Sequence, residues 1–316
     1  MHKGRVVLAG GSGFLGSMLA RELVASSYEV IILTRRPGPS TETIRQIAWD
    51  GKNLGDWSAF LKGAEAVVNL TGKSVNCRYT AQNRREIIES RVDSVNAIAQ
   101  AISRCTSPPR SWIQTGSLAI YGDAGDTVCD ETASPGTGFS VDTCKLWENS
   151  FAGADTPATR KVLLRIGFAL GRDGGSLGTL CKISRCFLGG AAGSGRQYIS
   201  WLHVHDLNQM FLAAIERPDI VGTFNATGPC PVTNWDFMLA LRRALHRPWS
   251  PRLPSWAIHI GARLIGTEPE LILTGRRCVP RRFAEVGVSF GFPHLEPALS
   301  DLRGASPASL AVKPAT

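Results

Sequence analysis

The amino-acid sequence predicts an α/β fold in which helices cover both faces of a doubly wound parallel sheet, with a smaller and mostly C-terminal α/β lobe beside it. Short β-rich runs alternate with longer amphipathic segments over the first 170 residues. The first run, residues 5–9, leads into a glycine-rich turn and then a helical pattern. This order is typical of parallel strands joined by crossover helices.

Five runs rich in apolar and β-branched residues are the predicted strands, at residues 5–9, 29–34, 64–70, 110–117 and 160–170. A helix follows the first strand through Leu23. A long helix is predicted from about Thr80 to Ser103, because apolar residues recur there at steps of three and four. These residues are Ile87, Ile88, Val92, Val95, Ile98 and Ile102.

The pattern changes after residue 170, where glycine becomes frequent. The stretches 171–180 and 187–201 favour loops or sheet-edge segments over core strands. Helical periodicity returns at residues 205–218, and Asp206 is the expected cap of that helix. An amphipathic helix is also predicted within residues 231–248, with Thr233 or Asn234 as its cap.

These patterns divide the chain into two parts and a tail. Residues 1–170 with about 206–227 are expected to form a nucleotide-binding domain, and residues 171–205 with 228–303 a substrate lobe that is partly helical. Residues 304–316 are small, proline-bearing and aperiodic, which predicts a disordered tail.

Composition argues against several classes of protein. No run approaches the roughly 18 apolar residues that a membrane-spanning helix needs, and no apolar leader precedes the first strand. We therefore expect a cytoplasmic protein, or one of an organelle stroma, with no membrane partner. The eight cysteines show no CxxC spacing, so neither a disulfide framework nor a zinc site is expected.

The formal net charge is +9, and five Arg-Arg pairs contribute to it. A basic balance suits anionic partners, from nucleotide phosphates to RNA. No array of aromatic residues is interleaved with the arginines, so a solvated basic surface is favoured over an RNA-binding one.

The glycine turn contains two overlapping patterns, Gly10-x-x-Gly13-x-x-Gly16 and Gly11-x-Gly13-x-x-Gly16. Glycines alone are weak evidence, but here an apolar strand precedes them and an amphipathic helix follows. In that context they permit a sharp turn and the close approach of a pyrophosphate to the helix N-terminus. A dinucleotide is therefore favoured over a plain strand-to-helix turn.

The end of the second strand indicates which dinucleotide. An NAD site usually has an acidic residue there, which accepts the ribose hydroxyls. This strand instead ends in Thr34-Arg35-Arg36, and no carboxylate lies between Val30 and Thr41. Guanidinium groups bind a 2′-phosphate that a carboxylate would repel, so NADP(H) is the expected cofactor. The alternative is a pair of solvated arginines on a loop.

Several further stretches make the chain resemble a known family. They are "VVNLTG" (67–72), "IIESRVDSVNAIAQAI" (87–102), "TGSLAIYG" (115–122), "CDET" (129–132), "GRDGGSLGTL" (171–180), "GGAAGSGRQYISWLHVHDL" (189–207) and "FNATGPCPVTNWDF" (224–237). The chain resembles the atypical extended short-chain dehydrogenase/reductases of the NAD(P)-dependent epimerase family. This branch, often labelled SulA-like or cell-division-inhibitor-like, has its own C-terminal domain.

The resemblance implies a Rossmann-type NADP-binding lobe with the active site in a cleft beside the substrate lobe. It implies contacts from the glycine turn, the ends of two strands, the long helix and a lysine. Asp50 would lie near the adenine edge. The expected cofactor-binding residues are Gly10, Gly13, Phe14, Leu15, Gly16, Thr34, Arg35, Arg36, Leu70, Thr71, Glu86, Arg91 and Lys145.

The resemblance also implies a Ser-Tyr-Lys set in which the tyrosine transfers a proton and the lysine lowers its pKa. Ser117 and Lys145 match two of the positions, and Glu148 follows as in the family. Val141 stands where the tyrosine is expected and cannot transfer a proton. Tyr121 is the candidate substitute, although packing beside the cofactor is the favoured interpretation of it.

Asp142 and Cys144 lie between Val141 and Lys145, flank the expected site and are titratable. His203, His205 and Asp206 suggest a metal site, but no third and fourth ligand is evident, so packing and capping are favoured. Arg196, Tyr198 and Trp201 are candidates either for substrate contact or for the wall of the cleft.

The leading interpretation is an NADP(H)-binding oxidoreductase or nucleoside-diphosphate-sugar epimerase with an atypical active site. Its partner would be a small-molecule substrate such as a sugar nucleotide. The alternative is a non-catalytic NADP(H)-sensing protein of cell or plastid division, and an RNA-binding protein is the least favoured. The sequence leaves a homodimer open.

Overall fold

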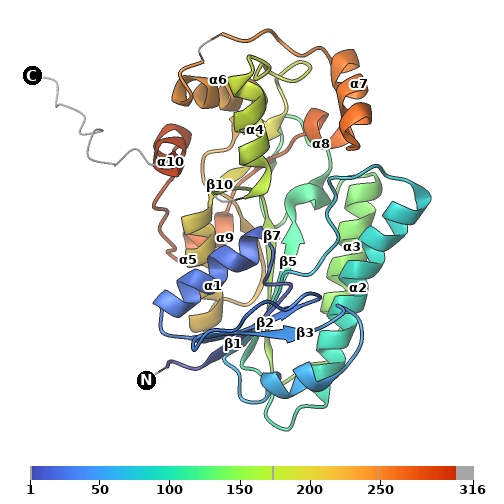
Figure 1. The fold of residues 1–316 in the computed structure, drawn as a ribbon, viewed down its shortest axis with the longest axis vertical. Helices are drawn as coiled ribbons and strands as arrows, with labels where there is room; N and C mark the ends of the chain where they lie inside the picture. Colours follow the sequence, from blue (N-terminus) through green and yellow to red (C-terminus); the bar gives the residue numbers. More distant parts are fainter. Residues whose placement is uncertain (1, 173, 248, 304–316) are drawn as a thin grey trace, which may run out of the picture.

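The computed structural model describes residues 2–172, 174–247 and 249–303. Its centre is a seven-stranded parallel sheet in the order β11-β7-β5-β4-β1-β2-β3 (Figure 1). Ligands of such sheets bind beyond the carboxyl ends of the strands where the order reverses, here between β1 and β4. The strands are β1 (Arg5–Ala9), β2 (Glu29–Thr34), β3 (Ile44–Ala48), β4 (Ala66–Asn69), β5 (Ser111–Ser117), β7 (Arg160–Ile166) and β11 (Gly222–Ala226).

Helices cover both faces of the sheet, which confirms the predicted doubly wound architecture (Figure 1). Helices α1 (Phe14–Ala25) and α5 (Val204–Glu216) pack on one face, and α2 (Ala81–Ser103) and α3 (Phe139–Ala152) on the other. Side chains alternate between the two cores: Val6 and Leu8 lie in the first, Val7 and Ala9 in the second. Burial on both faces explains why these strands read as continuous apolar runs.

The long helix was predicted correctly. Thr80 caps α2 by accepting a hydrogen bond from the Asn83 N–H at 3.2 Å. Thr233 likewise caps α6 (Asn234–Ala244) through the Asp236 N–H at 3.1 Å. In both cases a hydroxyl satisfies a donor that the first turn of a helix leaves unpaired.

The expected cap of α5 was wrong. The residue at the cap is His203, whose Nδ1 accepts from the His205 N–H at 3.1 Å. The Asp206 carboxylate instead accepts from the backbone N–H groups of Gly291 and Phe292, at 2.7 and 3.0 Å. Asp206 thus fastens a distant segment to α5, a role that local spacing could not indicate.

The glycine-rich stretch at 171–180 was also misread as a loop. It contains the start of helix α4 (Gly175–Arg185), which packs through Leu177 into a core shared with α6 and α10 (Leu295–Leu302). Glycine is unfavourable in a helix, so tertiary packing decides the structure here. Strand β3 was missed because it is a half-exposed edge strand with polar residues among its apolar ones.

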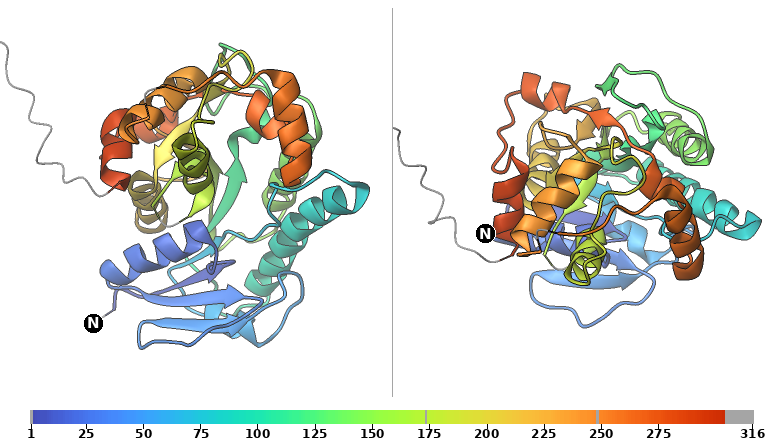
Figure 2. Two further views of the ribbon diagram at one scale, coloured as in Figure 1. Left: turned by 45° about the horizontal axis from the view of Figure 1, so that its top comes forward. Right: turned by 90° about the horizontal axis from the view of Figure 1, so that it is seen from above.

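The remaining elements lie mostly in the second half of the chain. In Figures 1 and 2, α4, α6, α7 and α8 gather at the end of the molecule away from the N terminus. No helix among the described residues is long and apolar enough to cross a membrane. The predicted tail, 304–316, lies outside the described residues. The elements are η1 (Asp56–Leu61), η2 (Leu118–Tyr121), β6 (Val128–Cys129), β8 (Phe168–Leu170), β9 (Tyr198–Ile199), β10 (Trp201–His203), β12 (Val232–Thr233), α7 (Ser255–Ile265), α8 (Glu270–Leu273), β13 (Arg277–Cys278) and α9 (Arg281–Glu285).

Candidate cofactor and active site

The glycines of the β1–α1 turn have separable roles. Gly10 has a φ of +75°, and a Cβ there would lie 3.0 Å from the backbone of Thr71. A Cβ on Gly16 would fall 2.5 Å from the Cα of Gly11, so only glycine lets α1 pack against the turn. At Gly13 a Cβ would meet only the Gly10 carbonyl oxygen, at 3.8 Å. The side of the turn at Gly13 is therefore open to a ligand.

The N-terminus of α1 suits an anion. Gly13 is its N-cap residue, and no side chain of the described residues caps the helix. The first backbone N–H groups and the positive end of the helix dipole are thus left for a ligand. The adjacent Thr71 carries a hydroxyl that is buried without a hydrogen-bond partner among the described residues. An open turn, a free helix end and an unpaired hydroxyl together fit a cofactor that carries phosphates.

Three predicted cofactor residues have contacts that hold the turn in place. The Leu70 N–H donates to the Ala9 carbonyl at 2.8 Å and so fixes the chain after β4 beside β1. Leu15 packs against the core on the α1 face of the sheet. The ring of Phe14 lies where a Cβ on Gly171, Gly174 or Gly175 would clash with it. The side chain of Phe14 therefore joins α1 to the start of α4.

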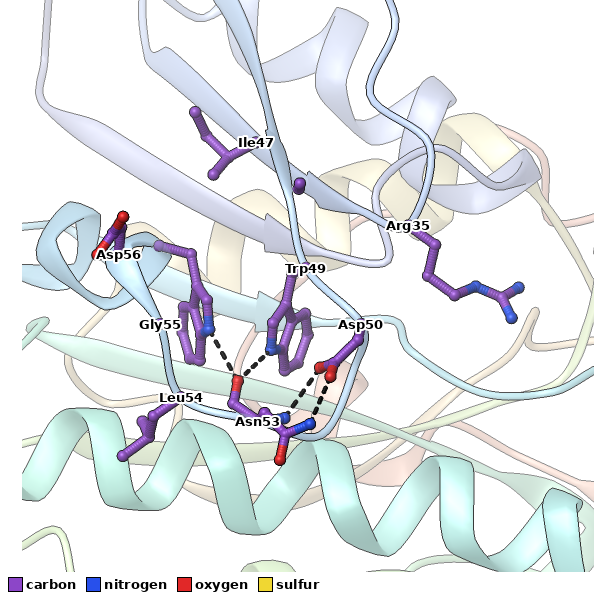
Figure 3. A pocket seen from close by; sticks show the side chains of 10 residues that line it. Arg35, Ile47, Trp49, Asp50, Asn53, Leu54, Gly55 and Asp56 are labelled. Carbon is purple, nitrogen blue, oxygen red and sulfur yellow. Dashed lines mark hydrogen bonds between the residues drawn. The ribbon is translucent and has the colours of Figure 1, made fainter.

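The end of β2 places Arg35 beside an open pocket of about 730 Å³. Thr34 is buried, and its hydroxyl bonds to that of Ser12 at 2.9 Å, which ties β2 to the glycine turn. Arg35 and Arg36 are exposed, and Arg35 lines the pocket. In Figure 3 the Arg35 side chain extends away from the loop around Asn53.

The loop opposite Arg35 is built around Asn53 (Figure 3). The indole N–H groups of Trp49 and Trp57 both donate to its carbonyl oxygen, at 2.9 and 3.0 Å. The Asp50 carboxylate accepts from the backbone N–H groups of Asn53 and Lys52, each at 2.9 Å. The hydrogen bond from the Asn53 backbone N–H is the largest of the causes that lower the pKa of Asp50. Asp50 is thus an ionised group that closes this loop.

The two predicted residues on α2 hold the segment that follows β4. Glu86 forms an ion pair with the Lys73 ammonium. The Arg91 guanidinium donates to the carbonyls of Lys73 and Ile87, at 3.0 and 2.9 Å, and lies 5.0 Å from the centre of the Trp147 ring. Burial lowers the pKa of Arg91, and none of the described carboxylates pairs with it.

The structure brings the expected Ser and Lys positions to adjacent elements, β5 and α3. The Ser117 hydroxyl accepts from the Ala119 N–H at 3.1 Å, and the Lys145 ammonium donates to the Gly136 carbonyl at 3.5 Å. Val141, one turn before Lys145 on α3, is only 1% exposed. The Cys144 thiol lies 4.0 Å from the Ser117 carbonyl oxygen, and burial raises its pKa to about 12. It therefore stays protonated at neutral pH.

The Tyr121 hydroxyl is engaged by protein groups. It has two acceptors, the Asp130 carbonyl and the Asn225 side-chain oxygen, each at 2.9 Å, and it accepts from Arg165 at 2.8 Å. The residue is 3% exposed, and burial raises the pKa of its hydroxyl to about 12. These contacts argue against Tyr121 as the substitute proton donor and favour a packing role.

Arg165 and Asn225 are the members of this network that the sequence analysis missed. Arg165 makes two parallel hydrogen bonds to the Glu148 carboxylate, at 2.9 and 2.8 Å, and both side chains are 12% exposed. Asn225 is fully buried, and its side-chain amide also donates to the Val279 carbonyl at 3.2 Å. The only sequence signal was that Arg165 and Asn225 occur in apolar strands, which hold polar residues rarely.

The histidine cluster has structural contacts. His203 lies 4.0 Å from the Phe292 ring centre and 3.3 Å from the Asp301 carboxylate. No group of three or more His, Cys, Asp or Glu side chains in the described parts of the chain is arranged to hold a metal. Asp142 and Arg196 are exposed. Trp201 is fully buried, and its indole N–H donates to the Cys230 carbonyl. The centre of the Tyr198 ring lies 5.3 Å from the Arg277 guanidinium.

A doubly wound sheet with an open glycine turn at its switch point defines a dinucleotide-binding protein. The chain belongs to the NAD dependent epimerase/dehydratase family, whose model matches residues 6–150. A second model, a domain of unknown function (DUF1731), matches residues 253–302. The family resemblance inferred from the sequence is therefore confirmed, including its C-terminal domain.

Relatives along nearly the whole chain support this assignment. The protein named epimerase family protein SDR39U1 is 34% identical in Bos taurus, over 94% of this chain and 99% of the relative. The crystal structure of human SDR39U1 (isoform 2) with NADPH is 30% identical, covers 95% of this chain and 99% of that chain, and has a TM-score of 0.85. A nucleoside-diphosphate sugar epimerase from Corynebacterium glutamicum is 27% identical over 94% of this chain and 57% of that chain, with a TM-score of 0.75.

Proposed function

We propose that this chain binds NADP(H), with the diphosphate at the Gly10–Gly16 turn and the 2′-phosphate at Arg35 and Arg36. The observation that carries this proposal is the open turn at Gly13 beside the unpaired, buried hydroxyl of Thr71. Two exposed arginines and no carboxylate after β2 favour the phosphorylated cofactor. The NADPH in the human SDR39U1 crystal structure supports the same choice.

The full proposed set keeps the residues inferred from the sequence. Gly10 and Gly16 shape the turn, Gly13 admits the diphosphate on its open side, Thr71 donates its hydroxyl, and Lys145 holds the ribose. We also propose the division into a cofactor domain, 1–170 with about 206–227, and a substrate lobe, 171–205 with 228–303. The cytoplasm or an organelle stroma is the proposed compartment. One plant relative, from Arabidopsis thaliana, is named chloroplastic.

For the reaction we propose hydride chemistry on a small hydroxyl or carbonyl compound such as a sugar nucleotide. NADP(H), when bound, would supply or accept the hydride. Ser117 would orient the substrate oxygen, and the positive charge of Lys145 would stabilise negative charge that develops on it. The Val141 side chain has no proton to give, and the Tyr121 hydroxyl is engaged elsewhere. The proton would therefore move through water or a group of the substrate.

The cofactor proposal is tested by measuring the dissociation constants of NADPH and NADH for the wild type and Arg35→Ala. We expect the wild type to prefer NADPH, and Arg35→Ala to lose roughly tenfold or more of NADPH affinity, since a charge-assisted contact is worth about 1.5–3 kcal/mol. NADH affinity should be unchanged. Arg104→Ala is the matched control, because Arg104 is an exposed arginine at the C-terminal end of α2. It should leave both affinities unchanged. Equal wild-type affinities for the two cofactors would contradict the assignment.

A second candidate function is NADP(H) sensing without turnover, and the buried Val141 together with the engaged Tyr121 favours it. A net oxidoreductase changes NADPH absorbance at 340 nm when mixed with sugar nucleotides or simple carbonyl compounds. An epimerase returns the hydride to its substrate, so its turnover is measured as epimerised product, and a sensor gives neither signal. Turnover that Ser117→Ala abolishes supports an enzyme, whereas tight binding with no turnover supports a sensor. Val141→Tyr is a poor test, because a tyrosine at a fully buried position forces the packing apart.

A further inference from the structure

The outer face of helix α7 is apolar. Trp256, Ile260 and Leu264 are spaced by four residues and so share one face, and they are 68%, 55% and 81% exposed. The opposite face is the buried one, through Ile258 and Ala262. A surface helix normally turns charged and polar residues to water on its outer face. This apolar face of α7 is therefore exposed where a surface helix normally carries polar side chains.

Further exposed apolar side chains lie in and beside the segment before α7. Trp249 is 67% exposed, and the hydroxyl of the next residue, Ser250, donates to the Phe187 carbonyl at 2.7 Å. This bond brings the exposed side chains of Phe187 and Leu188, just after α4, beside the same segment. We call Phe187, Leu188, Trp249, Trp256, Ile260 and Leu264 the apical patch. Its elements lie at the end of the long axis away from the N terminus (Figures 1 and 2).

Arginines accompany the apical patch. From residue 237 to residue 267 the chain carries five arginines and no carboxylate. Arg252 and Arg263 are exposed, and the Arg247 guanidinium lies 5.3 Å from the centre of the Phe187 ring. The acidic residues at either end of this stretch are engaged: Asp236 with the Thr233 hydroxyl and Glu268 with the Tyr79 N–H. Exposed Arg252 and Arg263 thus place positive charge beside the patch, on a stretch that carries no carboxylate.

The positive charge beside the patch favours an anionic partner over a second copy of the chain. A second copy of the chain would meet it through a symmetric interface, which would set arginines against arginines. An anionic surface would be attracted instead, since each Lys or Arg near acidic headgroups contributes about tenfold or less in affinity. Exposed tryptophan and aliphatic residues with flanking arginines match helices that lie in the membrane interface.

We propose that the apical patch docks this protein onto a bilayer that contains acidic lipids. Helix α7 lies flat, its outer face enters the boundary of headgroups and acyl chains, and the arginines contact the headgroup charges. With 11 residues, α7 is far too short to cross a bilayer, so the protein lies on the membrane. This inference revises the expectation of no membrane partner, which considered only spanning segments. It does not depend on the proposed cofactor function.

The test is co-flotation of the full chain with vesicles of phosphatidylcholine alone or with added phosphatidylserine. We expect partition onto the acidic vesicles only, a blue shift of tryptophan fluorescence, and release at high salt. Ile260→Glu with Leu264→Glu should lower the partition by about tenfold or more, since each loses an apolar contact. Both residues are exposed, so the fold should persist, and unchanged circular dichroism and thermal unfolding confirm it.

Two further double variants separate the apical patch from the rest of the surface and its apolar contacts from its charge. Val128→Glu with Val221→Glu changes two exposed valines in other parts of the fold and should leave the partition unchanged. Arg252→Glu with Arg263→Glu should abolish the preference for acidic vesicles. Equal partition of the Ile260/Leu264 variant and the wild type would overturn the proposal, as would no binding to acidic vesicles. A dimer in sedimentation that the Ile260/Leu264 variant dissociates, without vesicle binding, would assign the patch to self-association instead.

Discussion

In the cofactor half of the site, the turn from Gly10 to Gly16 leaves a helix end uncapped and the Thr71 hydroxyl without a partner. In the reaction half, the hydroxyls of Ser117 and Tyr121 and the Glu148 carboxylate already bond to protein groups. Unpaired buried polar groups are costly, and a ligand at the open turn would satisfy the Thr71 hydroxyl. The difference indicates a surface open to a dinucleotide beside a region whose polar groups are largely bonded to the protein.

The largest effect is expected from removal of the Glu148–Arg165 ion pair in the reaction half. Glu148→Gln leaves the Arg165 guanidinium buried without its carboxylate, and we expect the free energy of unfolding to fall by about 3–5 kcal/mol. Urea denaturation measures it. Glu285→Gln, which removes an exposed partner of Arg281, is the control and should cost under about 1 kcal/mol. If the Glu148 variant is as stable as the control, the network does not hold the fold.

The cofactor half can be divided between folding and binding with two glycines. Gly16→Ala should lower the free energy of unfolding by about 1–3 kcal/mol, because its Cβ would overlap the backbone of Gly11. Gly13→Ala meets nothing closer than 3.8 Å, so it should leave stability within about 0.5 kcal/mol. It should nevertheless weaken NADPH binding, because the methyl group occupies the open side of the turn. Wild-type NADPH affinity in Gly13→Ala would show that the ligand does not lie there.

Removal of the Tyr121 hydroxyl tests whether this residue supports the fold or donates a proton. Tyr121→Phe deletes the partner of Arg165 and Asn225, and we expect a loss of about 1–3 kcal/mol of stability. NADPH affinity, and any turnover that Ser117→Ala abolishes, should be unaffected. A Tyr121→Phe protein with full stability but no turnover would reverse the roles and make Tyr121 the proton donor.

The smallest effect appears only in alkali. Burial raises the pKa of the Cys144 thiol from 9.0 to about 12, so the folded state favours the protonated form. This contribution is fully present below pH 9 and is lost as the pH rises towards 12. The free energy of unfolding should therefore decline over that range, and less steeply in Cys144→Ala. Parallel declines of the two proteins in urea titrations at pH 8 to 11 would exclude Cys144 as a cause.

The cofactor half was also the more predictable from sequence. Its glycines, strands and capped helix depend on neighbours within a few residues, and the long helix 80–103 was predicted within one residue. The network around Tyr121 joins Asp130, Arg165 and Asn225, which lie up to 104 residues away, and no local pattern announces such partners. The same holds for Asp206, whose bonds reach Gly291 and Phe292, and for α4, where packing outweighs glycine.

The ring of Phe14 connects the glycine turn to the start of α4. Phe14 is the first residue of α1, and its ring fills the space that side chains at Gly171, Gly174 and Gly175 would need. An anion bound by the first N–H groups of α1 would therefore fix the residue whose ring contacts the start of α4. Filling the turn should stiffen the root of α4, a change that amide hydrogen exchange at Gly174 and Gly175 would register.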